Sequence, residues 1–419
     1  MTNTGKIELM APAGNFESLQ AAIDNGADSV YFGVDQLNMR ARASINFTID
    51  DLDEIARRCA PKGIRTYLTL NTIIYDHDLS IIKTLLDAAK KAGLTAVIAM
   101  DQAVIAYARQ IGMEVHISTQ INITNIETVK FYALFADTMV MSRELSISQV
   151  KKICQQIEKE QIKGPSGNLV EIELFGHGAL CMAVSGKCYL SLHSHNSSAN
   201  RGACKQNCRK KYTVIDQESG FEIELDNEYM MSPKDLCTIN FLDQIIDAGV
   251  KVLKLEGRGR APEYVATVTK CYREAIDSIA DGTYTREKVA DWMSRLETVY
   301  NRGFWSGYYL GQKLGEWSPN PGSNATQKKV YIGKGQHFYP KSNIAEFLIE
   351  AFDLNEGDKI LVQGPTTGSQ ELVVENMMVD TKPDHKKAVK GDVITFKTDF
   401  RVRPSDKLYK IVKNEQMVK

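Results

Sequence analysis

The stretch NGADSV, residues 25–30, joins the end of one apolar periodic segment to the start of another, and its pattern recurs along the chain. The same pattern appears as KGIRTY (62–67), AGLTAV (92–97), IGMEVH (111–116) and AGVKVL (248–253). In each case a helical pattern ends at a glycine, which suits the left-handed backbone that follows many helices. A short apolar run comes next and is typical of a buried parallel strand. The pattern therefore predicts repeated helix-to-strand units.

Eight apolar runs are predicted strands, and most of them are separated by helical patterns. Asn15 is the predicted N-cap of a helix that buries Phe16, Leu19, Ala22 and Ile23. The predicted strands are 7–10, 29–32, 65–70, 96–100, 114–118, 138–141, 171–175 and 252–255. This count and alternation predict the α/β class and a closed (β/α)8 TIM-type barrel. A doubly wound open sheet is the alternative, although no GxGxxG motif follows the first strand.

The barrel pattern is interrupted once and is followed by a region of different texture. We expect a TIM-type barrel over 1–317 with a cysteine-rich insertion at about 176–235, which includes a predicted hairpin at 212–225. The segment 318–329 is rich in Ser, Pro, Gly and Asn and is a predicted linker. Short β-rich runs separated by turns over 330–419 predict a small C-terminal all-β barrel or sandwich.

Composition narrows the compartment and the partners. The 419 residues are 43% hydrophobic, but they contain neither a run long enough for a membrane span nor a secretion signal. We therefore expect a cytoplasmic protein without a membrane partner, in which thiols stay reduced. The net charge of −1 gives no general case for nucleic acid. Local basic charge is found at 201–211 and in the C-terminal 328–419, where 16 Lys and Arg face 13 Asp and Glu.

Four cysteines lie within twenty-eight residues, at 181, 188, 204 and 208. Six residues separate the first two, which is loose for a zinc knuckle, whereas iron–sulfur clusters accept varied spacings. Iron–sulfur ligands, zinc ligands and unliganded redox thiols all remain open on spacing alone. Another cysteine, Cys237, lies 33 positions beyond Cys204. We interpret Cys59, Cys154 and Cys271 as buried structural thiols on helices.

Polar residues follow most of the predicted strands, where the functional groups of a TIM-type barrel lie. Among them are Asn71, Gln120, Arg143, His177, Glu256 and Arg258. Arginines at such a rim can hold carboxylates through two parallel hydrogen bonds. The spacing of His177 and Cys181 leaves open a cysteine nucleophile with a base. The sequence contains no HExxH or GxSxG motif.

Several of these stretches together resemble the collagenase-like peptidase family U32. They are MAPAGNFESLQAAIDNGADSVYFG (10–33), HISTQ (116–120), SREL (142–145), ELFGHGALCMAVSGKC (173–188), NRGACKQNCRKKY (200–212), SPKDLC (232–237), KLEGR (254–258) and NRGFWSGYYLG (301–311). The resemblance covers 6–312, and the C-terminal region resembles that of the longer members of the family. Members are reported as collagen-degrading enzymes or as hydroxylation proteins for tRNA, ribosomal RNA or ubiquinone.

The resemblance implies a 4Fe–4S cluster, with zinc as the alternative cofactor. Cys181, Cys188 and Cys204 match three cluster ligands of the family. Cys237 is the favoured fourth ligand and Cys208 is the alternative. The RNA-acting members use prephenate as a hydroxyl source, so prephenate is the implied co-substrate.

The expected function is that of an RNA-hydroxylating enzyme required for 5-hydroxylation of the wobble uridine in a tRNA anticodon loop. The expected catalytic residues are His177, Gln120 and Glu256. The residues expected to bind a small dicarboxylate substrate are Asn71, Arg143, Arg201 and Arg258. A collagenase-like peptidase is the first alternative, and a non-catalytic protein with a structural metal is the second. A related paralogue or a second copy of the chain is a further expected partner.

Overall fold

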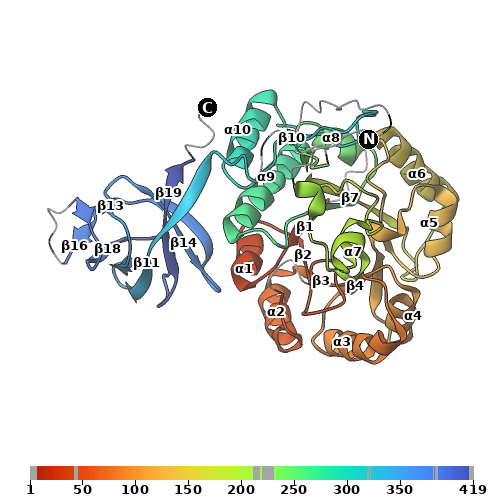
Figure 1. Cartoon of the computed structure of the whole chain (residues 1–419), viewed down its shortest axis with the longest axis horizontal. Coiled ribbons are helices and arrows are strands. Elements are labelled where there is room, and N and C mark those ends of the chain that lie inside the picture. Colours follow the sequence, from red (N-terminus) through yellow and green to blue (C-terminus); the bar gives the residue numbers. More distant parts are fainter. Residues whose placement is uncertain are drawn as a thin grey trace.

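The computed structural model describes residues 7–41, 46–210, 218, 231–318, 320, 322–380, 382 and 386–414. Figure 1 shows a barrel of strands surrounded by helices, with a separate group of C-terminal strands beside α1 and α9. The predicted hairpin at 212–225 lies outside the described residues, apart from Glu218. Within the described residues, no helix combines the length and the apolar character that crossing a membrane requires.

Eight parallel strands close into a barrel. The strands are β1 Glu8–Pro12, β2 Ser29–Phe32, β3 Arg65–Leu70, β4 Ala96–Ala99, β5 Glu114–Ile117, β6 Thr138–Val140, β7 Glu171–Gly178 and β9 Val252–Leu255. Strands β1 to β7 pair in chain order, and β9 pairs with both β1 and β7. The predicted TIM-type barrel is confirmed with all eight strands, and the open-sheet alternative is wrong.

Two short strands were not expected. Strand β8 (Asp235–Cys237) runs antiparallel to the end of β7, and β10 (Phe304–Trp305) pairs with β8. Both lie outside the closed ring and extend it beside the cysteine insertion. The pairing places Cys237 directly opposite His177.

Helices surround the barrel strands. They are α1 Phe16–Asp24, α2 Leu52–Cys59, α3 Leu79–Lys91, α4 Gln102–Gln110, α5 Ile126–Tyr132, α6 Ile147–Glu160, α8 Leu242–Asp247, α9 Pro262–Ala280 and α10 Arg286–Glu297. The start of α1 agrees with the prediction, because the Asn15 side chain accepts a hydrogen bond from the Ser18 amide at 2.8 Å. The recurrent glycines also behave as predicted. Gly26 and Gly249 follow α1 and α8 with φ of 87° and 92°, where a side chain would be strained.

Strand side chains alternate between the helix layer and the barrel interior. The interior contains a small apolar cluster that includes Met10, Tyr31 and Tyr67. It also contains a buried ion pair in which Lys254 Nζ lies 2.9 Å from Glu173 Oε1. Each of these buried side chains thus has a partner of opposite charge. Charged groups also lie at the opposite end of the strands, where Tyr67 Oη donates a hydrogen bond to the buried Glu8 at 2.7 Å.

The C-terminal strands form an antiparallel sheet, which confirms the predicted all-β class. Its order is β15-β14-β19-β11-β12-β18-β16, and β13 pairs separately with β17. The bounds are β11 Gln327–Tyr339, β12 Ile344–Ile349, β13 Leu354–Asn355, β14 Lys359–Gly364, β15 Gly368–Val373, β16 Met378–Val379, β17 Lys387–Ala388, β18 Val393–Lys397 and β19 Lys407–Lys413. The sheet has its own apolar core, which includes Phe347, Ile360 and Leu408. It contacts the barrel side, where Lys329 Nζ lies 2.9 Å from Glu263 Oε2 on α9.

Candidate functional site

The cysteine insertion begins where β7 ends at Gly178. A Cβ at Gly178 would lie 2.5 Å from the carbonyl oxygen of Glu256, so only glycine allows β7 to approach the end of β9 this closely. The insertion then crosses the barrel mouth and contains the short helix α7 (Leu190–His195). The chain is thus led directly from a barrel strand into the segment that holds the thiols.

Two arginines fasten the insertion to the barrel. Arg209 donates hydrogen bonds to the Leu180 carbonyl at 2.7 Å and to the Pro233 carbonyl at 2.8 Å. Arg201 donates to Asp78 Oδ2 at 2.5 Å and to the Ile73 carbonyl at 2.8 Å. Hydrogen bonds from charged donors are among the stronger ones in proteins. The middle of the insertion is therefore held to the barrel at two points.

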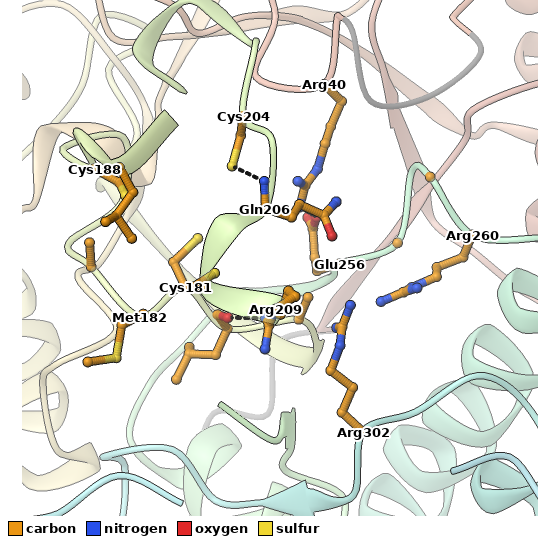
Figure 2. A pocket seen from close by; sticks show the side chains of 17 residues that line it. Arg40, Cys181, Met182, Cys188, Cys204, Gln206, Arg209, Glu256, Arg260 and Arg302 are labelled. Carbon is orange, nitrogen blue, oxygen red and sulfur yellow. Dashed lines mark hydrogen bonds and ion pairs between the residues drawn. The ribbon is translucent and has the colours of Figure 1, made fainter. Parts of the chain in front are cut away.

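The insertion and the barrel enclose a cavity of about 160 Å³ that we call the thiol cavity. Four cysteines line it: Cys181, Cys188, Cys204 and Cys208. Figure 2 shows the labelled thiols on one side and Arg40, Arg260, Arg302 and Glu256 on the other. Arg209 also lines it. The cavity brings together four thiols and four guanidinium groups with a single carboxylate.

Cys208 lines the thiol cavity together with Cys181, Cys188 and Cys204, whereas Cys237, the favoured fourth ligand, is not among the lining residues. Cys237 is buried in β8, and its sulfur lies 3.8 Å from both Tyr272 Oη and Met293 Sδ. Its burial raises the pKa of the thiol to about 11. The sequence motif places Cys237 close to the cysteine insertion. The antiparallel pairing of β8 with β7, however, buries the Cys237 side chain away from the thiol cavity.

The donor set of the thiol cavity fits an iron–sulfur cluster. Within the described residues, no three His, Cys, Asp or Glu side chains gather closely enough to hold a single metal ion. The four thiols instead stand at separate points around one cavity. A cluster takes one thiolate at each of several irons, so its ligands surround an object rather than converge on a point. Burial raises the pKa of the Cys208 thiol, and the nearby Arg209 guanidinium opposes that rise.

A second cavity of about 130 Å³, which we call the mouth cavity, adjoins the first. Its charged lining consists of four cations and one carboxylate: Arg40, Arg143, Lys254, Arg258 and Glu256. The two cavities share three of the thiols, together with Arg40 and Glu256. An excess of positive charge in a confined space attracts anions. The mouth cavity is therefore suited to a small anionic molecule that lies next to the thiols.

Glu256 lines both cavities and is ionised at neutral pH. Its Oε1 is 2.6 Å from Arg40 Nη2, and Tyr31 Oη donates a hydrogen bond to its Oε2 at 3.0 Å. Burial alone would raise the pKa of Glu256, but Arg40 outweighs burial and lowers the pKa to about 2. At neutral pH this carboxylate therefore accepts hydrogen bonds and has no proton to give.

Five of the predicted rim residues meet in the mouth cavity: Asn71, Gln120, Arg143, Glu256 and Arg258. Arg258 donates to Asn38 and Thr69, each at 3.0 Å, and burial lowers its pKa to about 10. Arg143 lies 3.7 Å from the centre of the Phe175 ring. Its buried Nε has no hydrogen-bond partner among the described residues. An unpaired buried N–H beside a cavity is what an anionic ligand would satisfy.

Two predicted site residues are not part of either cavity lining. His177 is buried against the rings of Tyr264, Tyr272 and Phe304, and burial lowers its pKa to about 3. No hydrogen bond joins it to Cys181 within the described part of the chain, which leaves the predicted cysteine nucleophile without its base. Arg201 is committed to Asp78 and serves to hold the insertion. The β7–β8 pairing explains why His177 does not line either cavity, and the fold of the insertion explains why Arg201 does not.

Several lining residues were not anticipated. Lys254 and its partner Glu173 carry charge inside otherwise apolar strands, and this is the signal that could have identified them. Arg40 follows β2, where the barrel rule also predicts function. Arg260 and Arg302 give no such signal, because the loops that bring them to the thiol cavity are far apart in the sequence.

Comparison with known proteins places this geometry among relatives. The model for peptidase family U32 matches residues 14–319. A Porphyromonas gingivalis protein named "Collagenase" is 54% identical over 414 residues, covering 99% of this chain and 100% of that protein. The Bacillus subtilis "tRNA hydroxylation protein P1" is 29% identical over 424 residues, covering 97% and 95%. The Helicobacter pylori "tRNA hydroxylation protein P" is 31% identical over 316 residues, covering 73% and 72%.

Proposed function

The chain belongs to peptidase family U32, and from that premise we propose that it is an iron–sulfur protein required for RNA hydroxylation. The observation that carries the proposal is the junction of the thiol cavity and the mouth cavity, which share Cys181, Cys188 and Cys204. Relatives named for tRNA hydroxylation, which cover almost the whole chain, support an RNA substrate. The finer proposal is 5-hydroxylation of the wobble uridine of tRNA.

In this proposal Cys181, Cys188, Cys204 and Cys208 hold a 4Fe–4S cluster. Converting a C–H bond of a base into C–OH removes two electrons, which the hydroxyl donor takes up when it gives its OH to the base and receives the hydrogen in exchange. A bound cluster would supply one-electron redox chemistry at the wall that the two cavities share. Arg209 holds the insertion in place through its bonds to Leu180 and Pro233.

The mouth cavity would bind the hydroxyl donor, which we propose to be a dicarboxylate such as prephenate. Arg143 and Lys254 line it, and the unpaired Nε of Arg143 is available to a carboxylate. Glu256 repels a misplaced carboxylate and holds Arg40 in position at 2.6 Å. Asn71 and Gln120 line the same cavity and add neutral donors and acceptors. These residues would bind and orient the co-substrate beside the cluster.

A wobble base is accessible to such a recessed site because it lies in a single-stranded loop. Proteins recognise loop bases by splaying them out of the stack and reading their edges. Enzymes that act on a base also turn it into a pocket. The target uridine would reach the wall between the thiol cavity and the mouth cavity by the same movement.

Nucleoside analysis of cellular tRNA tests the proposal. In a strain lacking this gene and its paralogues, 5-hydroxyuridine and its derivatives should disappear from tRNA digests measured by mass spectrometry. The wild-type gene should restore them, and Cys181→Ala should not. Cys271→Ala is the matched control, because this buried thiol lies under α10 and away from the cavities. Unchanged hydroxylation in the deletion strain would contradict the proposal.

The name of the relative from P. gingivalis favours a peptidase as the second candidate. The same purified protein should then cleave denatured collagen, and the cleavage should depend on a residue of the thiol cavity. Its exposed Cys181 is the natural residue to replace. Cleavage that persists unchanged in Cys181→Ala would assign the activity to another site or to a contaminant.

A further inference from the structure

A third cavity lies between the barrel and the C-terminal sheet, and we call it the interdomain cleft. At about 490 Å³ it is larger than the thiol and mouth cavities. Its barrel wall is formed by residues 259–264, by Thr267 on α9 and by 298–300 after α10. Its other wall comes from the linker end and from β11, β14, β15 and β19. Ligand sites favour such junctions between folding units.

The charges that line the cleft leave a positive excess. Glu263 is paired with Lys329 at 2.9 Å, and Glu371 is paired with Lys359. These two carboxylates are therefore neutralised by neighbouring lysines. In the described parts of the chain, Arg260 has no carboxylate partner, and the exposed Lys328 has none either. The cleft thus has one cation of its own, Lys328, without a carboxylate partner among the described residues, and shares a second, Arg260, with the thiol cavity.

Arg260 is held in a geometry suited to an anion. Its guanidinium carbon lies 3.5 Å from the centre of the Tyr300 ring, so the planar group stacks on the aromatic face. Stacking uses the face of the guanidinium and leaves its N–H edge free to donate two parallel bonds. Phosphate oxygens match that edge. The stacked pair restrains a donor that would otherwise lose more side-chain entropy on binding.

The cleft and the thiol cavity share part of their walls. Gly259 and Arg260 line both of them, and Lys328 lines the cleft farther along toward the C-terminal sheet. Figure 2 shows the Arg260 side chain extending toward the thiol cavity beside Arg302. Arg260, at the wall shared with the thiol cavity, and Lys328, on β11, give the cleft two separate cations. Two separate cations suit a chain of phosphates better than a single small anion.

We propose that the interdomain cleft binds backbone phosphates of the RNA strand whose target base enters the barrel mouth. Arg260 contacts one phosphate and Lys328 contacts another. The inference rests on the proposed RNA function and adds the surface that positions the strand. An acidic protein segment would meet the same charges, and it is the alternative that the test separates from RNA.

The test measures binding of a fluorescent anticodon stem–loop RNA to the full-length, anaerobically purified chain across a range of salt concentrations. Each phosphate contact with single-stranded nucleic acid adds about 0.7 to the slope of log affinity against log salt. Lys328→Gln should lower the slope by about 0.7 and weaken binding about 5-fold at ~0.1 M salt. Arg260→Gln combined with Lys328→Gln should weaken it about 25-fold. Lys341→Gln is the control, since this exposed lysine in the β11–β12 turn removes the same charge outside the cleft.

The outcomes separate the two proposals. A wild-type chain that binds the RNA while both cleft variants keep its affinity and slope would overturn the cleft and leave the proposed function standing. An equal loss in Lys341→Gln would also overturn it, because the effect would then come from general surface charge. A wild-type chain that binds no RNA would overturn both proposals and would turn attention to an acidic protein partner. Thermal unfolding of each variant checks that its fold is intact.

Discussion

The eight cysteines of the chain fall into two regions with opposite surroundings. Cys59, Cys154, Cys237 and Cys271 are buried in the barrel, and burial raises their pKa values to about 12, 12, 11 and 12. Cys181, Cys188, Cys204 and Cys208 are exposed or partly exposed in the insertion and share a cavity with four arginines. The same side chain is thus an inert apolar filler in one region and a candidate ligand in the other.

Glu256 shows that burial alone does not explain the difference. Like the barrel thiols it is buried, yet its pKa is lowered to about 2 because Arg40 compensates the charge. A buried acidic side chain in this part of the protein therefore keeps its negative charge when a guanidinium group lies beside it. The arginines around the thiol cavity are therefore as much a part of the proposed cluster site as the thiols.

The largest expected effect comes from replacing, one at a time, the two cysteines that are candidates for the fourth cluster ligand. Cys208→Ala should lose nearly all bound iron after anaerobic purification, because it removes one ligand from the thiol cavity. Cys237→Ala should keep its iron and lose only about 1–2 kcal/mol of stability, as expected for a small cavity in the core. Iron analysis and urea unfolding of both variants check this. Iron loss in Cys237→Ala, with iron retained in Cys208→Ala, would identify Cys237 as the fourth ligand instead.

Alkylation of the metal-free protein should separate the same two regions by rate. Only thiolates react, and a thiol with a pKa of about 11 is ionised in about one molecule per thousand at pH 8. Cys181, Cys188 and Cys204 should react first because they are exposed or partly exposed, and labelling of the barrel thiols should rise about tenfold for each pH unit up to their pKa. Mass spectrometry of peptides labelled at pH 7, 8 and 9 measures this. Early labelling of Cys271 would contradict it.

Glu256→Gln should destabilise the protein by about 3 kcal/mol at pH 7, because it removes a carboxylate whose folded-state pKa is far below its ordinary value. A depressed pKa adds stability above the ordinary value of about 4.3, and that stability is lost as pH falls toward about 2. Urea unfolding at pH 7, 4 and 3 should therefore show a shrinking difference from wild type.

The matched control for this variant is Glu127→Gln on α5. Its side chain is 76% exposed and it forms a surface ion pair with Lys130, so the change should cost less than about 1 kcal/mol. A cost for Glu256→Gln that is the same at pH 7 and pH 3 would mean that the carboxylate is not held ionised by Arg40.

The smallest expected effect concerns the arginine that fastens the insertion. Arg209→Gln removes charge-assisted bonds to Leu180 and Pro233, each worth about 1.5–3 kcal/mol. Loss of iron to a chelator should become about 10-fold faster, and iron content before the challenge should change little. Lys205→Gln, an exposed neighbour in the same insertion, should leave the rate unchanged. An equal acceleration in Lys205→Gln would show that net charge, and not the anchoring of the insertion, controls retention.

Most of the fold could be predicted from the sequence because each barrel strand is marked by a short apolar run, which in several cases follows a glycine at a helix end. Gly26 and Gly249 end their helices as predicted, and all eight predicted strands pair in the closed ring. The residues at strand ends, such as Asn71 and Arg143, were found by the same rule and do line the mouth cavity. Local pattern and barrel geometry act together at these positions.

The remaining site residues depend on contacts between distant segments. Cys208 and Cys237 could not be distinguished by spacing, because the antiparallel pairing of the three-residue β8 decides which of them faces the thiol cavity. Arg201 was predicted to bind the substrate, but in the fold its guanidinium forms an ion pair with Asp78. Likewise, Arg260 reaches the site only because the connection from β9 to α9 lies beside the insertion.

The most direct test of the central claim is the iron and acid-labile sulfide content of the wild-type chain purified without oxygen. The account predicts about four irons and four sulfides per chain, all lost when Cys181, Cys188, Cys204 and Cys208 are replaced together by alanine. A chain that carries zinc or no metal, and that still restores 5-hydroxyuridine to tRNA, would contradict the claim that the thiol cavity holds a redox cluster.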